Sequence, residues 1–372
     1  MRAALLITIL FWFSAATQQA NDIAARFNRA MELQRQGAWQ EAVAEYRALL
    51  AVTPNYAEAQ ANLGAALARL GNYPEAIAAY EAALRLKPEL TPILLNLGIA
   101  HYRAGQFAKA VEVLERFLAV APGHAQARQL IGVSLVELGR DDEAVKYLEP
   151  ALSARQAEAT ALYSLGLAYL RLHRTEVSTV VERLAARADG IALSRLLQGQ
   201  AYLEQLELEK AVAELEAAAK LSPDLPRLHF LRGLAYFKVG RSAEARKLLE
   251  RELGRAADDF LTLYYLASLL EKQGELGVAR QRIEAALKQE PQSVEALTLA
   301  GSVLLKLGQA AEAARALEQA VAQQPGNSET RYLLARSYQK LGRKQDAARE
   351  FAEVERLKTQ AREREKERKP NP

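Results

Sequence analysis

The sequence contains no cysteine among its 372 residues. Disulfide bonds, thiolate metal sites and a cysteine-linked lipid anchor are therefore excluded, and packing alone must stabilise the fold. Aromatic residues are also few, at 7% of the chain, whereas 50% of the residues are hydrophobic and alanine is abundant. The apolar material is thus sufficient for a core, and the composition favours helices over strands.

The chain carries little excess charge of either sign. Its formal net charge is +4, from 49 basic and 45 acidic residues. The segment from Arg356 to Lys369 holds seven basic and three acidic residues, so it accounts for the whole excess. A nucleic-acid-binding protein is expected to carry a basic stripe on its body, so we do not expect nucleic acid as a partner.

Long apolar runs are absent except at the start of the chain, which reads MRAALLITILFWFSAATQQA. One early arginine, an uncharged run to Phe13 and small residues up to Ala16 are typical of a secretory signal peptide. We therefore predict a signal peptide at residues 1–16, a short lead-in at residues 17–22, and an exported protein that is periplasmic or secreted. An uncleaved membrane tether is the alternative, although the run is short for a bilayer span. No membrane span is expected after cleavage.

A period of 34 residues runs through the remainder of the chain. The stretch NLGAALARLGNYPEAIAAYEAALRLKP begins at Asn62, and NLGIAHYRAGQFAKAVEVLERFLAVAP begins at Asn96. Every step between units is 34 residues, except for one step of 33 between the fifth and sixth units. The ten units start at Ile23, Ala57, Thr91, Ala125, Ala159, Ala192, Pro226, Phe260, Val294 and Ser328.

Small residues recur at two positions of the unit. The eighth position holds Gly64, Gly98, Gly132, Gly166, Gly199, Gly233 and Gly301, with Ala30, Ala267 and Ala335 in the other units. The twentieth position holds Ala42, Ala76, Ala110, Ala144, Ala211, Ala245, Ala279, Ala313 and Ala347, with Ser178 as the exception. A glycine inside a helix costs about 1 kcal/mol relative to alanine, so its recurrence needs a compensating contact. We expect the missing side chain to let two helices approach closely, with the alanine twelve residues later as the partner.

A second glycine and a proline mark the ends of two helices in each unit. The second glycine occurs at Gly37, Gly71, Gly105, Gly139, Gly240, Gly274, Gly308 and Gly342. It is predicted to end the first helix in a left-handed cap. The prolines, which are predicted to end the second helix, are Pro54, Pro88, Pro122, Pro223, Pro291 and Pro325. Each unit is thus predicted to be two antiparallel helices joined by a short turn.

The chain resembles the tetratricopeptide repeat family, which has a 34-residue period and an L-G, Y, A, F, P pattern. In the second unit this pattern is matched by Leu63, Gly64, Tyr73, Ala76, Tyr80, Ala83 and Pro88. The resemblance implies an all-α, right-handed superhelical solenoid of about ten helix-turn-helix repeats over residues 23–360, whose first helices line a concave groove. Residues 361–372 form a charged C-terminal tail, interpreted as a solvated cap or, alternatively, as a docking arm for an anionic partner.

The pattern weakens in the fifth unit. His173 replaces the turn glycine, Ser178 the alanine and Gly190 the proline. Two interpretations stay open: a drifted repeat with altered packing, or a weak joint at residues 171–191 that acts as a hinge between two rigid arms.

Signals for catalysis are scarce. The histidines lie far apart, the glycines are spaced for helix packing and not for phosphate binding, and no serine has a nucleophile-elbow context. We therefore expect no cofactor, no metal and no enzymatic activity. An enzyme remains a remote alternative, because it would need a groove that assembles residues distant in sequence.

Candidate ligand-binding residues lie in the predicted first helices. Asn28, Asn62 and Asn96 share the sixth position, where the resemblance implies that an asparagine amide holds the backbone of a bound peptide. Simple repeat consensus is the alternative explanation. The lysine and asparagine positions of the carboxylate clamp that some relatives use are occupied by Phe27, Ala61, Leu95, Met31, Ala65 and Ile99. Binding of chaperone tails is therefore not expected.

The remaining candidates are mostly apolar or aromatic. They are Tyr102, Tyr163, Leu167, Gln200, Phe230, Phe237 and Tyr264. Part of this column is expected to pack between neighbouring repeats, and the remainder to form an apolar stripe for an amphipathic peptide. The sequence thus predicts a non-catalytic scaffold that binds a protein or peptide in its groove, within a cell-envelope or secretion-related complex. The alternative is a structural element that self-associates.

Overall fold

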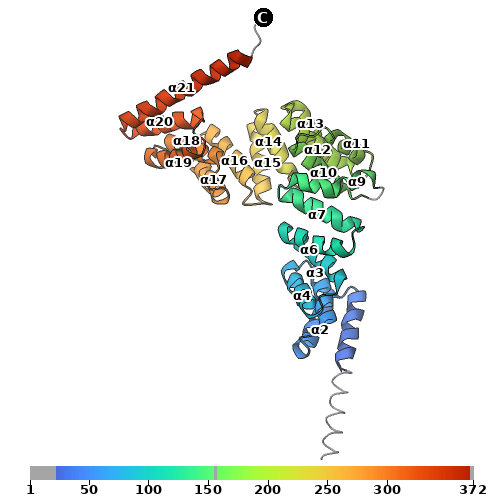
Figure 1. Cartoon of the computed structure of the whole chain (residues 1–372). Helices are drawn as coiled ribbons and strands as arrows, with labels where there is room; N and C mark the ends of the chain where they lie inside the picture. The colour runs from blue at the N-terminus through green and yellow to red at the C-terminus, as the bar shows by residue number, and fades with distance from the viewer. Residues whose placement is uncertain (1–21, 155–156, 369–372) are drawn as a thin grey trace, which may run out of the picture. The chain divides into compact units, whose positions relative to one another are not determined.

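The computed structural model describes residues 22–154 and 157–368, which form α-helices joined by turns, with no β-strand in either range (Figure 1). The predicted signal peptide at residues 1–16 lies outside the described residues. Within them, no helix combines the length and the hydropathy needed to cross a bilayer. The chain divides into two compact units, Met1–Leu197 and Gln198–Pro372.

The helices alternate as first and second members of ten repeats. The first members are the helix over residues 22–35, α3 (Ala57–Arg69), α5 (Thr91–Arg103), α7 (Ala125–Glu137), α10 (Ala159–Arg171), α12 (Ile191–Glu204), α14 (Leu228–Lys238), α16 (Phe260–Gln273), α18 (Val294–Lys306) and α20 (Ser328–Lys340). The second members are α2 (Trp39–Val52), α4 (Tyr73–Leu86), α6 (Phe107–Val120), α8 (Asp141–Leu148) with the short α9 (Pro150–Ser153), α11 (Val177–Ala185), α13 (Leu208–Leu221), α15 (Ser242–Leu253), α17 (Leu276–Gln289), α19 (Ala310–Gln323) and α21 (Lys344–Arg368).

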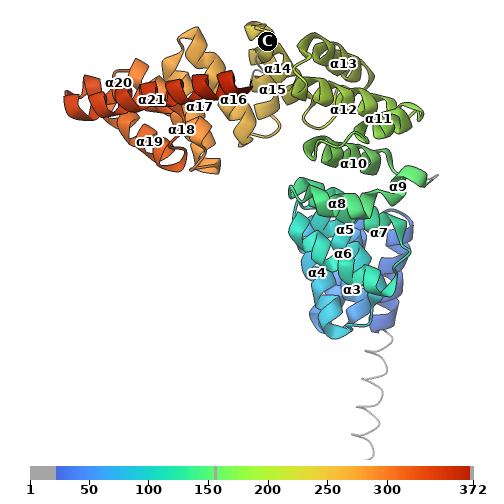
Figure 2. The ribbon, with the colours of Figure 1, turned by 45° about the horizontal axis from the view of Figure 1, so that its top comes forward.

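Within each unit, a first helix packs on the second helix of its own repeat, and that second helix packs on the next repeat, as two runs of helices illustrate. In the first unit, α3 packs on α4, α4 on α5 and α5 on α6 (Figure 2). In the second unit, the same order continues from α16 to α21. The all-α fold of helix-turn-helix repeats predicted from the sequence is therefore confirmed.

The chain reverses through the same left-handed turn in all ten repeats. Eight turns place glycine there, with φ between 71° and 81°. His173 in the fifth repeat and Leu206 in the sixth take this conformation without being glycine, with φ of 54° and 60°. The next residue then closes the turn by donating its N–H to the carbonyl five residues earlier, as Asn72 does to Leu67 at 3.0 Å.

The prolines stop the second helices as predicted. In the six repeats with a proline, the second helix ends two residues before it, as α2 ends at Val52 before Pro54. A proline has no N–H to donate, and it disfavours helical conformation in the residue before it. The residue at which these second helices end is therefore determined by the proline that follows.

The predicted partner of the helix glycine is wrong. A Cβ atom on Gly98 would lie 2.5 Å from the side chain of Leu114, sixteen residues later, and one on Gly64 would lie 2.8 Å from the ring of Tyr80. The same relation holds for Gly132 with Leu148, Gly199 with Leu215, Gly233 with Leu249 and Gly301 with Leu317. The glycine thus admits a large side chain of the second helix at the twenty-fourth position, and the predicted alanine is buried one helical turn away.

The fifth repeat departs from this packing. Its twenty-fourth residue is Glu182, whose charge would be costly to bury beside a glycine. The space at Gly166 is filled instead by the side chain of Leu197 of α12. The second helix α11 is only nine residues long, and Ser178 is exposed. These features agree with a drifted repeat, and the hinge at residues 171–191 stays a prediction.

Three tyrosines at the eleventh position link neighbouring repeats. Tyr169, Tyr236 and Tyr338 donate hydrogen bonds to Glu149, Glu216 and Glu318 of the preceding repeat, at 3.1, 2.7 and 2.8 Å. An arginine five residues after each tyrosine lies over its ring, 4.0 to 5.7 Å from the centroid. Burial raises the pKa of Tyr169 and Tyr338 to about 12, so these hydroxyls stay protonated donors.

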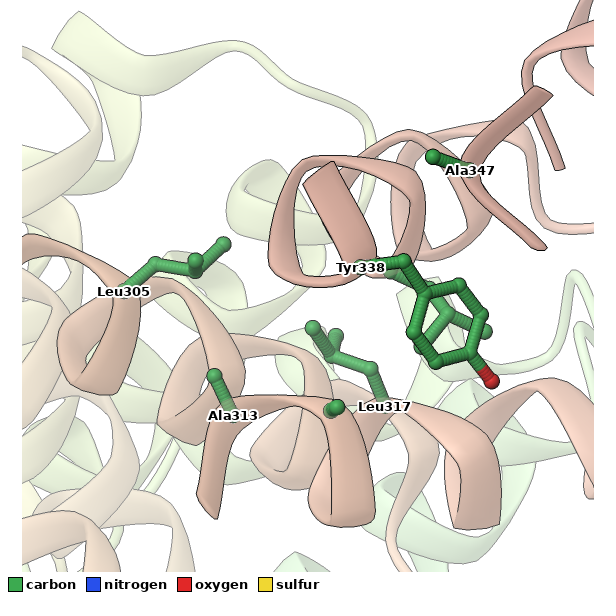
Figure 3. Close-up of a cluster of buried hydrophobic side chains, with 7 residues drawn as sticks. Leu305, Ala313, Leu317, Tyr338 and Ala347 are labelled. Carbon is green, nitrogen blue, oxygen red and sulfur yellow. The ribbon is translucent and has the colours of Figure 1, made fainter. Parts of the chain in front are cut away.

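The last two repeats share a compact apolar cluster (Figure 3). Leu317 of α19 and Tyr338 of α20 are both buried and point into the space between their helices. Burying a leucine of this size stabilises a fold by about 1.5–3 kcal/mol. The final helix α21 packs by Ala347 and Val354, and its residues 361–364 are exposed.

Candidate functional site

The first repeats of the N-terminal unit enclose a hollow of about 660 Å³. Its lining combines aromatic rings, amides, two arginines and small apolar residues. These residues are Gln34, Trp39, Ala65, Ala68, Arg69, Tyr73, Tyr80, Asn96, Ile99, Ala100, Arg103 and Gln126.

The hollow arises because equivalent positions of successive repeats lie on the same surface. Ala65 and Ile99 both occupy the ninth position, and Arg69 and Arg103 both occupy the thirteenth. Trp39 occupies the seventeenth position, as Tyr73 does one repeat later. A residue type that returns every 34 residues is therefore presented repeatedly on this surface.

The electrostatic character of the hollow is positive. Arg69 and Arg103 are exposed, and no aspartate or glutamate lines the hollow. The guanidinium carbon of Arg69 lies 5.8 Å from the ring centroid of Trp39, which is cation–π distance. The wall thus offers two cations beside aromatic surface.

Two buried tyrosines support this surface from the second helices. Burial raises the pKa of Tyr80 to about 12, against the opposing effect of the Arg69 charge. Burial also raises the pKa of Tyr46 to about 12, although a hydrogen bond from Asn62 lowers it. The Tyr46 hydroxyl in turn donates to Oε1 of Gln34 at 3.0 Å. Both hydroxyls are therefore neutral hydrogen-bond donors at physiological pH.

The three predicted asparagines have different environments. Asn96 is exposed and lines the hollow. Asn62 is half-buried and bonds the Tyr46 hydroxyl, so part of its hydrogen-bonding capacity is used within the protein. Asn28 is exposed but does not line the hollow. Of the three asparagines predicted from the sequence, one therefore lines the hollow, and Asn62 is linked to it through Tyr46 and Gln34.

The apolar candidates contribute more to packing than was predicted. Phe230 is only 4% exposed and packs on Tyr265, with ring centroids 6.1 Å apart, so its assignment to a ligand surface is wrong. Phe237 and Tyr264 are half-buried, and both also contact the ring of Tyr265. The repeat pattern could not reveal this, because an aromatic side chain on a first helix can also face the next first helix.

The remaining candidates are half-buried and lie outside the hollow. They are Tyr102, Tyr163, Leu167 and Gln200. The ring of Tyr102 packs edge-on against that of Phe107, with ring centroids 5.9 Å apart.

Sequence reasoning missed the cationic and aromatic members of the hollow. The sequence does contain a signal for these residues. The thirteenth position is arginine in adjacent units, at Arg69 and Arg103, and the seventeenth is aromatic, at Trp39 and Tyr73. The described residues contain no group of three or more histidine, aspartate or glutamate side chains that could hold a metal ion.

Family models described as tetratricopeptide repeats match most of the repeat region. The matched residues are 63–131 for one model, 27–90 and 264–328 for a second, 199–240 for a third, and 101–168 and 304–363 for a fourth. A search of curated proteins found no significant match.

Several solved structures are similar to this chain. The crystal structure of the APC/C hetero-tetramer Cut9-Hcn1 matches with a TM-score of 0.58 and 14% identity, over 90% of this chain and 80% of that chain. Yeast Tom70 matches with a TM-score of 0.41 and 13% identity, over 91% and 92%. MamA (residues 41 to the end) from Desulfovibrio magneticus RS-1 matches with a TM-score of 0.42 and 21% identity, over 45% and 96%. At these identities, the similarity to Cut9 shows a common fold alone.

Proposed function

Because the chain is a tetratricopeptide repeat protein with multiple repeats, we propose that it is a non-catalytic scaffold that binds a protein or peptide in the hollow of its N-terminal repeats. The observation that carries this proposal is the composition of the hollow. A volume of about 660 Å³ is within the usual range of ligand sites, roughly 300–1,000 Å³.

The side chains of the hollow suit a peptide. The amide of Asn96 can donate to a peptide carbonyl and accept from a peptide N–H, as can the amides of Gln34 and Gln126. Trp39 and Tyr73 offer aromatic surface, which often supplies the strongest contacts of a protein interface. The Cut9 structure is a hetero-tetramer with Hcn1, so a chain of this fold can assemble with a second protein.

We also propose that the protein is exported and works within a cell-envelope or secretion-related complex. The support is the sequence of residues 1–16, which has the order of a secretory signal peptide.

The test uses the full mature chain as bait for proteins of its own cell envelope. The affinity of each captured protein is then measured by titration against the wild type and against the Trp39→Ala and Asn96→Ala variants. Each variant should weaken binding by about tenfold, because each removes an anchor or a hydrogen-bonding group. Asn28→Ala is the matched control, since Asn28 holds the same repeat position outside the hollow.

The proposal is wrong if the hollow variants bind every captured partner as tightly as the wild type. Light scattering over a range of concentrations distinguishes the scaffold from the alternative function, which is self-association. A mass that rises with concentration, without any added partner, would indicate a self-associating structural element.

A further inference from the structure

We propose that the hollow takes an acidic peptide segment, with a carboxylate held by the guanidinium groups of Arg69 and Arg103. This inference rests on the proposed function and adds the chemistry of the ligand. Both arginines line the hollow, and no acidic side chain does. A carboxylate that enters therefore meets two cations without a competing anion.

Both guanidinium groups are available to a ligand. Arg69 and Arg103 are exposed, and neither forms an ion pair with any described residue. Arg35, at the same position of the first repeat, is instead bound to Glu32 at 2.9 Å and lies outside the hollow. A free guanidinium keeps its planar set of five donors, which matches the two oxygens of a carboxylate.

The positive surface of the hollow is short. Glu137, at the thirteenth position of the fourth repeat, interrupts the basic series after Arg103. Arg171, at this position of the fifth repeat, is paired with Asp141 at 3.3 Å. A polyanion such as nucleic acid needs an extended run of basic contacts for affinity, which this series does not provide. A local acidic segment of a peptide fits two arginines one repeat apart.

The aromatic residues specify what should stand beside the acid. Trp39 lies under the Arg69 guanidinium, and Tyr73 repeats the aromatic position one unit later. A ring beside a cation helps to orient it and offers apolar surface to a neighbouring ligand side chain. The ligand should therefore place an apolar or aromatic residue next to its carboxylate.

This site differs from the carboxylate clamp that the sequence excludes. Two positions of that clamp hold Ala65 and Ile99, which form part of the apolar lining here. The cations come from the thirteenth position, at the last turn of each first helix. The inference therefore depends on a different set of residues.

The experiment uses two synthetic peptide pools and the full mature chain. One pool holds fluorescein-labelled decapeptides that alternate Asp or Glu with aromatic and aliphatic residues. The matched pool replaces every acid with Asn or Gln. Binding is followed by fluorescence anisotropy for the wild type and for Arg69→Gln, Arg103→Gln and Arg35→Gln, and circular dichroism checks that each variant is folded.

We expect the acidic pool to bind at least about tenfold more tightly than the amide pool, and added salt to weaken it. Arg69→Gln and Arg103→Gln should each weaken binding by about tenfold, whereas the control Arg35→Gln should leave it unchanged. Equal affinity for both pools, no binding of either pool, or an equal effect of Arg35→Gln would overturn the inference.

Two further results would overturn this inference without overturning the proposed function. A captured partner that depends on Trp39 and Asn96 but not on the arginines would overturn the acidic ligand and leave the scaffold in place. A single-stranded DNA oligonucleotide that binds with the same arginine dependence as the acidic pool would also overturn it, because the site would then recognise negative charge of any source.

Discussion

At the scale of single residues, the turn between the two helices makes the strictest demand. A residue other than glycine in the left-handed region is unfavourable by about 1–2 kcal/mol, because its Cβ crowds the following carbonyl. Eight turns avoid this with glycine, and histidine is one of the side chains more often found there. Leu206 is the exception, since it is neither small nor polar and is 70% exposed.

Replacing Leu206 with glycine should therefore stabilise the protein. We expect the Leu206→Gly variant to gain about 1 kcal/mol, after allowing for the greater freedom of glycine in the unfolded chain. Urea denaturation followed by circular dichroism measures the change. Leu206→Ala is the control, because it removes the exposed side chain but keeps the Cβ. An equal gain from alanine would show that the backbone conformation is not the cause.

We expect a buried histidine to make the stability of the second unit depend on pH. His229 is 1% exposed, and neither ring nitrogen has a hydrogen-bond partner among the described residues. Burial, followed by the charge of Arg251, lowers the pKa of His229 below its usual 6.5. As the pH falls below 6.5, the unfolded chain takes up a proton that the folded chain resists, so stability is lost.

We expect the His229→Phe variant to lose less stability than the wild type between about pH 7 and pH 5, because it has no imidazole to protonate. Thermal melts at several pH values measure this difference. The control is His173→Gln, since His173 is exposed in a turn. Parallel pH profiles for the wild type and His229→Phe would contradict the assignment.

At the scale of elements, one large side chain of the second helix fills the space over a glycine of the first helix in six of the ten repeats. Leu114 occupies this space at Gly98, with its Cγ 2.5 Å from where a Cβ would lie. A methyl group there must displace the leucine or separate α5 from α6. The fifth repeat shows the same rule by exception, since Leu197 takes the place that Glu182 cannot fill.

Gly98→Ala should destabilise the protein by about 1–3 kcal/mol, the usual effect of overpacking a core. Adding Leu114→Ala should recover part of this loss, because the smaller side chain makes room for the methyl group. A double-mutant cycle by urea denaturation measures the coupling. Strictly additive effects of the two changes would show that the glycine serves another purpose.

At the scale of the whole molecule, the chain is an array of tetratricopeptide repeats, and the ligand site that we propose belongs to its first four units. Stability in such an array is roughly a sum over repeats and their interfaces. The Tyr–Glu–Arg contacts across repeats, as at Tyr338, and the half-buried pair Arg331–Glu350 near the C-terminus add specific links to the apolar interfaces.

The position of the molecule in the cell depends on the N-terminal segment. If residues 1–16 are a cleaved signal peptide, the mature chain begins at Thr17 and is found outside the cytoplasm. Intact-mass measurement of the protein recovered from its own cells checks this. A mass that retains Met1 or Arg2 would favour the uncleaved tether.

The sequence by itself determined the repeat frame, the helix pairs and their ends. The turn glycine and the proline act through the local backbone, so their positions predict turns and helix ends wherever they recur. Tertiary structure alone decided which side chains meet. It showed that Leu114 and not an alanine faces Gly98, and that Leu206 adopts a glycine's conformation. It also brought Trp39, Arg69 and Arg103 together, because residues from separate repeats share a surface only once the helices between them are packed.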